Sequence, residues 1–378
     1  MNIIIAPDSF KGSLSTTQVA DHIKAGVQRV FPNASFQMIP MADGGEGTVD
    51  AMVSSLGGRF ETVTVTGPMG TPVEARFGIL NDGKAVLEMA AASGLPLVPA
   101  DQKDICRATT YGTGEMLKKA MDMGCKKIYI GIGGSATNDG GIGMAQALGA
   151  HFLDKDGQEA AYGGGSLAGI ETIDLSSMDA RLKETEITVM CDVDNPLCGP
   201  KGASAVYGPQ KGATPELVEF LDSGLGHLAD VMKASGLPDL RDMPGAGAAG
   251  GLGMGLAVFT GAVLRSGIEA VLEAAGFVQK LDWAHLVITG EGRIDEQSVF
   301  GKVPTGISKY ASQHKVPVIA VVGCIGHGAS AVYAHGINTI ESCVYAPSTL
   351  EEALANAAAN VEDAAERVMR AVEIGMMI

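Results

Sequence analysis

The sequence lacks the features that would tie the protein to a membrane, a zinc site or a disulfide framework. No uninterrupted apolar run reaches the roughly 20 residues that span a bilayer, and the first residues show no basic and apolar secretion signal. The six cysteines include no CxxC pair, and the seven histidines form no pair at metal-ligand spacing. We therefore expect a cytoplasmic protein whose cysteines are reduced and mostly buried as small apolar side chains.

Cations are also scarce. Lysine and arginine number 27 against 43 aspartates and glutamates, which gives a formal net charge of −16. Such a balance repels phosphate backbones and anionic lipids, so nucleic acid and membrane partners are not expected. The sequence leaves the oligomeric state open. Because cations are few, a lysine or arginine beside a glycine-rich loop is a stronger candidate for binding an anionic small molecule.

Two widespread catalytic motifs are missing. No GxxxxGK[ST] segment occurs, which excludes a P-loop ATPase, and no GxSxG segment occurs, which argues against a serine hydrolase of the α/β class. Any phosphate site must therefore be built from other loops.

The chain of 378 residues exceeds the usual size of one core and predicts two domains. Short apolar runs alternate with helical segments, which is typical of a mainly parallel α/β sheet. The loops at the carboxyl ends of such strands normally carry the site. The predicted strands are Ile3–Ala6, Phe36–Pro40, Lys127–Ile132, Ile187–Cys191, His285–Thr289, Val316–Val322 and Asn338–Tyr345.

Local signals refine this picture. Ser15 with Gln18, and Ser348 with Glu351, have capping-box spacing at helix starts. Alternation over Thr62–Thr66 followed by a Gly-Pro-Met-Gly turn indicates antiparallel strands. We predict a discontinuous Rossmann-like doubly wound domain over 1–60 and 281–378, with an inserted α/β domain containing antiparallel strands over 61–280. The strand at Lys127 fits either sheet.

The first two strands open into polar loops. Asp8, Ser9 and Lys11 combine free backbone N–H groups with a cation, as an anion site requires, although ordinary capping explains the same residues. Asp43 and Glu46, separated by paired glycines, could face a hydroxyl or a hydrated Mg²⁺, or could complement a helix dipole.

The loop after the Lys127 strand, Gly133–Gly141, is dense in hydroxyl, amide and N–H donors, and Arg107 precedes it. We favour ligand contact here. Gly131–Ala136 also fits the loose dinucleotide pattern GxGxx[GA], with Asp154 roughly twenty residues beyond. However, Thr137–Gly141 cannot start a helix cleanly, so a pyrophosphate would lack a helix N-terminus.

Three later segments are further candidates. Asp192 and Asp194 follow a buried strand and could hold a metal ion or orient a hydroxyl, or simply form a turn before Asn-Pro. Lys201 and Gly208–Gly212 are either phosphate contacts or solvated turns. Gly245–Gly255 runs into an apolar helix and either cradles phosphates or allows close helix packing.

The strand His285–Thr289 opens into Glu291, Arg293 and Asp295, and Lys302 follows. Two carboxylates and a guanidinium within one turn are the mixture that phosphoryl transfer uses. A local salt bridge is the alternative interpretation.

Taken together, the phrases APDSFKGSLS, PMADGGEGT, YGTGE, GGSATNDGG, DVDNPLCG, GPQKGA, GAGAAGGLG and ITGEGRIDEQS, with GK after the last, resemble the bacterial glycerate kinase family. The match runs in order along nearly the whole chain. The resemblance implies ATP-dependent phosphorylation of D-glycerate at the 2-hydroxyl, with Mg²⁺, in glycerate, glyoxylate or aldarate catabolism. It also implies a Rossmann-like domain with a second α/β domain.

The resemblance assigns no individual roles, so these are predicted from chemistry. Asp295, Asp192 and Lys11 are the candidate catalytic residues. Candidate metal ligands are Asp192, Asp194 and Glu291. Predicted substrate contacts are Asp8, Ser9, Asp43, Glu46, Arg107 and Arg293, and predicted nucleotide contacts are Gly133, Gly134, Ser135, Thr137, Asn138, Gly247, Gly250, Gly251 and Lys302. Two other functions stay open at this point: an NAD-dependent oxidoreductase of a small hydroxy acid, and a non-enzymatic binding protein.

Overall fold

The computed structural model describes residues 1–39, 41, 45, 47–299 and 302–378. The chain divides into two compact units. Unit 1 comprises residues 1–42, 54–56 and 271–378, and unit 2 comprises residues 43–53 and 57–270. The sequence-based boundaries at 60 and 281 stay a prediction.

Unit 1 is built on a five-stranded, fully parallel sheet in the order β15-β13-β11-β1-β2. In chain order this is 2-1-3-4-5, a doubly wound arrangement, as predicted. The long excursion into unit 2 falls between the second and third strands, β2 and β11. The strands are β1 (Asn2–Pro7), β2 (Ser35–Met38), β11 (Leu286–Gly290), β13 (Val318–Val322) and β15 (Thr339–Ser342).

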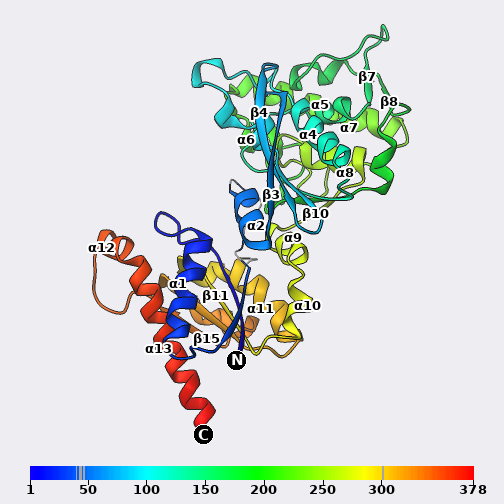
Figure 1. The fold of residues 1–378 in the computed structure, drawn as a ribbon. Coiled ribbons are helices and arrows are strands. Elements are labelled where there is room, and N and C mark those ends of the chain that lie inside the picture. The colour runs from blue at the N-terminus through cyan, green and yellow to red at the C-terminus, as the bar shows by residue number, and fades with distance from the viewer. Residues whose placement is uncertain (40, 42–44, 46, 300–301) are drawn as a thin grey trace. The chain divides into compact units, whose positions relative to one another are not determined.

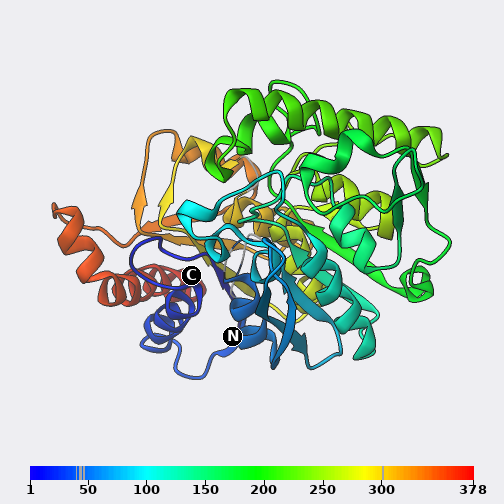
Figure 2. The same ribbon diagram turned by 90° about the horizontal axis from the view of Figure 1, so that it is seen from above.

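Helices α1 (Thr16–Gln28) and α13 (Ala357–Met377) lie side by side against this sheet (Figure 1). Buried α1 positions such as Val19 and Ile23 recur at helical spacing and pack with Ile3 and Ile288 of the strands. The other α-helices of this region are α9 (Gly267–Ala274), whose residues 267–270 belong to unit 2, α10 (Phe277–Leu281), α11 (Val303–Gln313) and α12 (Leu350–Ala355). A short parallel pair is formed by β12 (Arg293–Ile294) and β14 (Cys324–Ile325), drawn in yellow and orange in Figure 2.

The capping boxes were predicted with mixed success. Ser15 and Gln18 form a reciprocal capping box at the start of α1, as expected. At the second site the prediction of Ser348 with Glu351 is wrong, because the box is formed one residue later by Thr349 and Glu352. Both pairs have the required spacing, but α12 begins at Leu350, which makes Thr349 the N-cap residue.

Unit 2 is built on a six-stranded mixed sheet in the order β10-β9-β6-β5-β4-β3. The β3–β4 hairpin is antiparallel, as predicted, and β5, β6, β9 and β10 are parallel. The strand at Lys127, β6, belongs to this sheet. The strands are β3 (Gly58–Thr66), β4 (Pro72–Leu80), β5 (Ala85–Glu88), β6 (Lys127–Gly131), β9 (Glu186–Met190) and β10 (Val263–Arg265), and a separate pair is β7 (His151–Leu153) with β8 (Thr172–Asp174).

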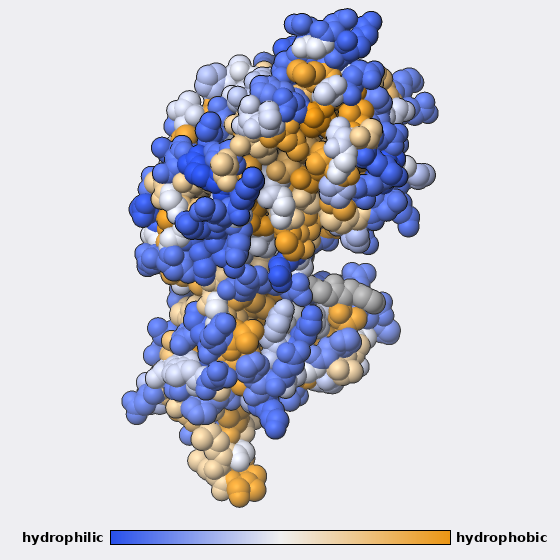
Figure 3. Space-filling view, turned by 90° about the vertical axis from the view of Figure 1, so that its right-hand side faces the viewer, coloured by the Kyte–Doolittle hydropathy of each residue, from blue (hydrophilic) through white to orange (hydrophobic). Residues whose placement is uncertain are grey.

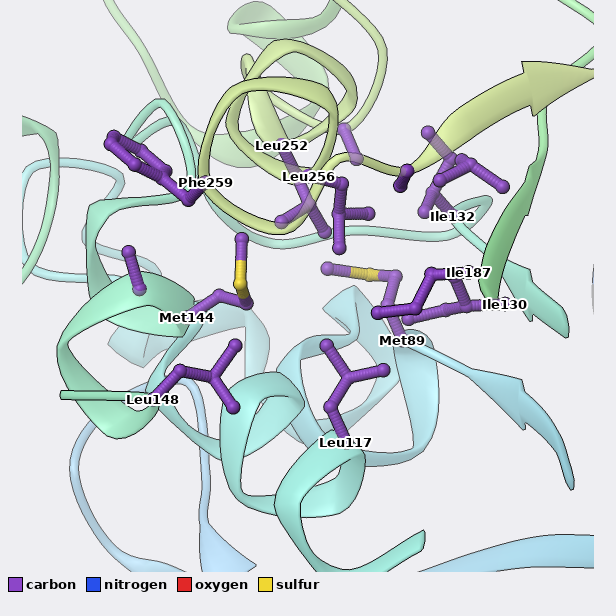
Figure 4. Close-up of a cluster of buried hydrophobic side chains, with 14 of the residues drawn as sticks. Met89, Leu117, Ile130, Ile132, Met144, Leu148, Ile187, Leu252, Leu256 and Phe259 are labelled. Atoms are coloured by element: carbon purple, nitrogen blue, oxygen red, sulfur yellow. The ribbon is translucent and has the colours of Figure 1, made fainter. Parts of the chain in front are cut away.

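Helices bury the apolar side chains of the unit 2 strands (Figure 4). Ile130 of β6 and Ile187 of β9 lie in one cluster with Leu117 of α4, Met144 of α5 and Leu256 of α8. The α-helices are α2 (Thr48–Leu56), whose residues 54–56 belong to unit 1, α3 (Ala90–Ser93), α4 (Tyr111–Asp122), α5 (Ile142–Ala147), α6 (Ala203–Tyr207), α7 (Pro215–Ala234) and α8 (Leu252–Thr260).

Two surface properties complete the description. The cysteines are free, but only Cys125 and Cys343 are buried, so the expectation of mostly buried thiols is wrong.

Exposed apolar side chains gather at the end of α13, at the bottom of Figure 3, where Ile374, Met376, Met377 and Ile378 lie. Within the described ranges, no helix is both long and apolar enough to cross a membrane.

Candidate active-site residues

Two of the predicted polar loops meet in unit 1. β1 pairs with β11 in parallel register, with Ile3 opposite Leu286 and Pro7 opposite Gly290, so both loops leave the same edge of the sheet. The order of the strands reverses direction between these two neighbours, and doubly wound sheets bind their ligands at such a switch point. The backbone N–H of Asp8 donates to the carbonyl oxygen of Gly290, which joins the loops directly.

Glu291 is the most buried acid of these loops, with a side chain 8% exposed. Its Oε2 lies 3.3 Å from Lys302 Nζ, while its Oε1 is buried and has no hydrogen-bond partner among the described residues. Burial raises the pKa of the Glu291 carboxyl, and Ser298 and Lys302 oppose that shift. A buried carboxylate oxygen without a partner is costly unless a ligand satisfies it.

Asp295 stands beside this group. Its Oδ2 lies 3.2 Å from Arg293 Nε, its Oδ1 lies 3.9 Å from Lys302 Nζ, and the same Oδ1 accepts a hydrogen bond from the Gln297 N–H. The structure thus brings together four residues that sequence reasoning had singled out: Glu291, Arg293, Asp295 and Lys302. Two acids and two cations within hydrogen-bond or ion-pair distance can bind a charged ligand together with its counterion.

The structure describes fewer contacts for the remaining predicted residues of the loops after β1 and β2. Ser9 donates its N–H to Asp8 Oδ1 at 2.6 Å, and Asp8 is close enough to Glu291 to influence its carboxyl. Lys11 is exposed on the turn that follows, and its backbone nitrogen approaches Gly292. Asp43 and Glu46 lie outside the described residues.

Unit 2 holds a pocket of about 300 Å³ at the carboxyl ends of β6 and β9. We call it the Lys211 pocket after its buried cation. It includes Gly133, Gly134 and Ser135 from the predicted nucleotide contacts and Asp192 from the predicted catalytic residues. Its lining is Gly45, Leu95, Ile132, Gly133, Gly134, Ser135, Met190, Cys191, Asp192, Val193, Tyr207, Gln210, Lys211, Ala248 and Ala249.

The loop between β6 and α5 is held by a buried aspartate. Asp139 accepts hydrogen bonds from the N–H and hydroxyl of Thr110, at 2.8 and 2.9 Å, and from the N–H of Gly141 at 3.1 Å. Burial raises the pKa of the Asp139 carboxyl, and these donors oppose the shift. Since α5 begins only at Ile142, no helix N-terminus directly follows β6, and the dinucleotide-binding alternative loses its structural basis.

Other predicted nucleotide contacts turn inward from this loop. Thr137 and Asn138 are fully buried, and Asn138 Nδ2 donates to Ser204 Oγ. The hydroxyl of Thr137 has no partner in the described part of the chain.

The glycines Gly247, Gly250 and Gly251 are buried and make close backbone contacts. A Cβ atom at Gly250 would collide with the carbonyl oxygen of Thr137, and one at Gly247 would collide with that of Pro196. Gly250 also has φ +69°, a conformation that favours glycine. These contacts support the packing explanation for the segment, and its alanines Ala248 and Ala249 are the residues that reach the pocket.

The two aspartates after β9 differ in their surroundings. Asp192 lines the Lys211 pocket, and its Oδ1 accepts from the N–H of Gly267 at 3.0 Å. Asp194 is exposed and does not line the pocket. Arg107 is likewise exposed, on the turn before Ala108. Among the residues that the structure describes, no three acidic, histidine or cysteine side chains converge as a metal site.

Sequence reasoning left two buried groups unassigned. Asp139 lies inside the phrase GGSATNDGG, and Lys211 lies in the glycine-flanked turn Gly208–Gly212 that was left undecided between a phosphate contact and a solvated turn. The structure shows that Lys211 is buried, with 2% of its surface exposed. The signal available beforehand was a lysine next to glycines in a chain with few cations.

Comparison with known proteins decides the family. A model of the glycerate kinase family matches residues 3–373. This chain belongs to the glycerate kinase family. The resemblance drawn from the sequence motifs is therefore confirmed, and the protein is a kinase.

Similar proteins cover the chain from end to end. It is 50% identical over 375 residues to a glycerate kinase of Bacillus subtilis (strain 168), with 99% of this chain and 98% of the relative covered. It is 48% identical over 377 residues to the glycerate 2-kinase of Escherichia coli (strain K12), with 100% and 99% covered. A crystal structure from Salmonella typhimurium LT2, provisionally named glycerate kinase 2, superposes with a TM-score of 0.89 at 48% identity, covering 100% of both chains.

Proposed function

We propose that this member of the glycerate kinase family transfers the terminal phosphoryl group of ATP to the 2-hydroxyl of D-glycerate, giving 2-phospho-D-glycerate and ADP. We place this activity in glycerate, glyoxylate or aldarate catabolism. The observation that carries the proposal is the group of Glu291, Asp295, Lys302 and Arg293 at the switch point of the unit 1 sheet. Names of similar proteins support the substrate and the position of transfer.

The group fits a magnesium–phosphate ligand. Mg²⁺ is usually held by one or two protein carboxylates together with substrate phosphates and water, so a cluster of three protein ligands is not required. Glu291 offers a buried oxygen without a described partner. Asp295 offers a second carboxylate, and both acids contact Lys302. When bound, Mg²⁺ would neutralise phosphate charge at this edge of the sheet.

The protein residues then have distinct tasks. Lys302 and Arg293 would hold phosphate oxygens through charge-assisted hydrogen bonds, and their pairs with Glu291 and Asp295 keep both cations at this site. Asp295 would orient the glycerate hydroxyl, with Asp192 as the other candidate for this role. Proton removal itself adds little in this chemistry, because phosphoryl transfer depends mainly on positioning and charge neutralisation.

A coupled ADP-release assay with D-glycerate, ATP and Mg²⁺ tests the activity, with NAD(H) as a rival cofactor. We expect ADP release that requires glycerate, and a ³¹P NMR spectrum of the product that identifies the 2-phosphate. ADP release without glycerate, or turnover only with NAD(H), would refute the kinase proposal. A 3-phosphate product would refute only the position of transfer.

Lys11 provides a prediction that addresses the loop after β1. Lys11→Ala should lower kcat/KM by about ten- to a hundredfold, because it removes a charge-assisted contact to a carboxylate or phosphate worth roughly 1.5–3 kcal/mol. Its exposed side chain makes a folding defect unexpected. Steady-state kinetics measure the effect, and Lys11→Arg, which keeps the charge, is the matched control. If Lys11→Ala stays within twofold of the parent, the Lys11 side chain has no role in binding.

A further inference from the structure

Lys211 is a buried cation whose hydrogen-bond partners carry no charge. It ends a 3₁₀ turn, η5 (Pro209–Lys211), and its Nζ donates to Ser135 Oγ at 2.8 Å and to the carbonyl oxygen of Thr137 at 2.7 Å. A lysine ammonium has three N–H donors, so these two bonds leave one donor. Burying a charge is costly unless it is paired with an opposite charge.

The buried acid that influences Lys211, Asp139, does not provide that pair. Asp139 influences Lys211 through space, but its carboxylate is engaged with Thr110 and the N–H of Gly141. No ion pair of Lys211 occurs within the described ranges. The other titratable or charged groups that face this region are Asp192, Cys191 and Tyr207 in the pocket lining, and Lys103, which contacts the same turn through the carbonyl oxygen of Gln210.

The pocket beside Lys211 is suited to a small anionic ligand. Its volume of about 300 Å³ lies at the lower end of the range for small-molecule sites. Gly133 and Gly134 are exposed on its wall, so their backbone is accessible to a ligand in the pocket. Ser135 lies on the same wall and also holds the lysine.

We propose that the free donor of Lys211 binds an oxyanion of a small ligand in the Lys211 pocket, either a carboxylate or a phosphoryl oxygen. The inference rests on the proposed function, which supplies both kinds of oxyanion: the carboxylate of glycerate and the phosphates of the nucleotide. Lys211 is then a binding residue, and through Ser135 and Thr137 it also positions the loop after β6.

Binding of an oxyanion at such a site is coupled to the uptake of a proton by Lys211. Burial lowers the pKa of Lys211 to about 7, with Asp139 opposing the shift. Above pH 7 the free protein therefore holds Lys211 mostly neutral, and an oxyanion that requires the ammonium draws a proton from solution. Affinity should consequently fall as pH rises from about 7, approaching tenfold per unit.

Isothermal titration calorimetry tests this directly. The complete chain is titrated at about pH 8 in two buffers with different protonation enthalpies, once with D-glycerate and once with a non-hydrolysable ATP analogue and Mg²⁺. We expect close to one proton taken up per site for the ligand that meets Lys211. Lys211→Met, a neutral side chain of similar length, should remove this uptake and weaken that ligand by about ten- to a hundredfold.

The controls separate a structural defect from the proposed contact. Lys103→Met removes an exposed lysine that touches the same turn and should change neither proton uptake nor affinity. The pH dependence of wild-type affinity needs no variant at all, so it remains informative if Lys211→Met unfolds. Subtracting the proton uptake of a folded Lys211→Met variant removes protons that belong to the phosphate groups themselves.

The outcomes are distinct. If proton uptake and affinity depend on Lys211 only for D-glycerate, the site binds a carboxylate. If they depend on Lys211 only for the ATP analogue, the site binds a phosphate. Equal proton uptake and equal affinity in wild type and Lys211→Met for both ligands would overturn the inference. If wild-type protein binds but produces no glycerate-dependent ADP, the proposed function fails while the Lys211 site stands.

Discussion

Asp295→Asn should lower kcat by about a hundredfold or more while changing KM much less, if Asp295 acts in the transition state. Asparagine keeps an oxygen that can accept from the Gln297 N–H, so the turn should persist. The substitution removes the negative charge that faces Arg293 at 3.2 Å and Lys302 at 3.9 Å. Steady-state kinetics with glycerate and ATP varied separately give both constants, and a thermal melt near that of the parent shows that folding is intact.

The matched control for this variant is Glu296→Gln. Glu296 is the next residue and is exposed, so losing its charge should leave kcat close to the parent value. If Asp295→Asn also keeps a near-parent kcat, the orienting role passes to Asp192, and Asp192→Asn becomes the variant that should lose activity. In that case the loop from Gly290 to Ser298 would not be where the chemistry takes place.

Gly250→Ala should destabilise the protein by about 3 kcal/mol or more. Its backbone adopts φ +69°, and a Cβ atom would collide with the carbonyl oxygen of Thr137, which is backbone and cannot rotate away. A loss of this size corresponds to a fall in Tm of about 6–12 °C for a domain of this size. Differential scanning calorimetry measures it.

Gly157→Ala separates the two causes. Gly157 has a similar φ of +73°, but no heavy atom lies within 4 Å of the position its Cβ would take. Only the left-handed conformation is then penalised, by about 1–2 kcal/mol. Equal losses in the two variants would show that the loop carrying Thr137 moves aside. Because Thr137 also accepts from Lys211, such a movement should alter the Lys211 pocket as well.

Much of the fold followed from local pattern. The five strands of the unit 1 sheet, and β6 and β9 of the unit 2 sheet, were predicted to within a few residues, because buried parallel strands read as short apolar runs such as Ile3–Ala6. The other two parallel strands of unit 2, β5 and β10, were not predicted. The hairpin β3–β4 followed from strict alternation and a Gly-Pro turn. The second capping box was misplaced by one residue, since Ser348 and Thr349 offer the same spacing and only the start of α12 at Leu350 decides between them.

The candidate site was less predictable. Residue type and position after a strand were enough to single out Glu291, Asp295 and Lys302, which the structure then groups. The same reasoning predicted Gly247, Gly250 and Gly251 as nucleotide contacts, with close packing as the alternative, and the Cβ positions of all three face other parts of the chain. Glycine allows close approach of any partner, and sequence cannot tell whether that partner is a ligand or another loop.

The amino-acid sequence by itself determined the class of fold, the strand ends that carry polar loops and, through motifs spread along the chain, the family. These properties depend on periodicity and on residues close together in the chain. Only the tertiary structure decided which loops meet: Asp8 beside Gly290, and Lys211 beside Ser135 and Thr137. These partners lie at least 74 residues apart in the sequence, and burial, which gives Lys211 its altered pKa, is a property of the packed chain.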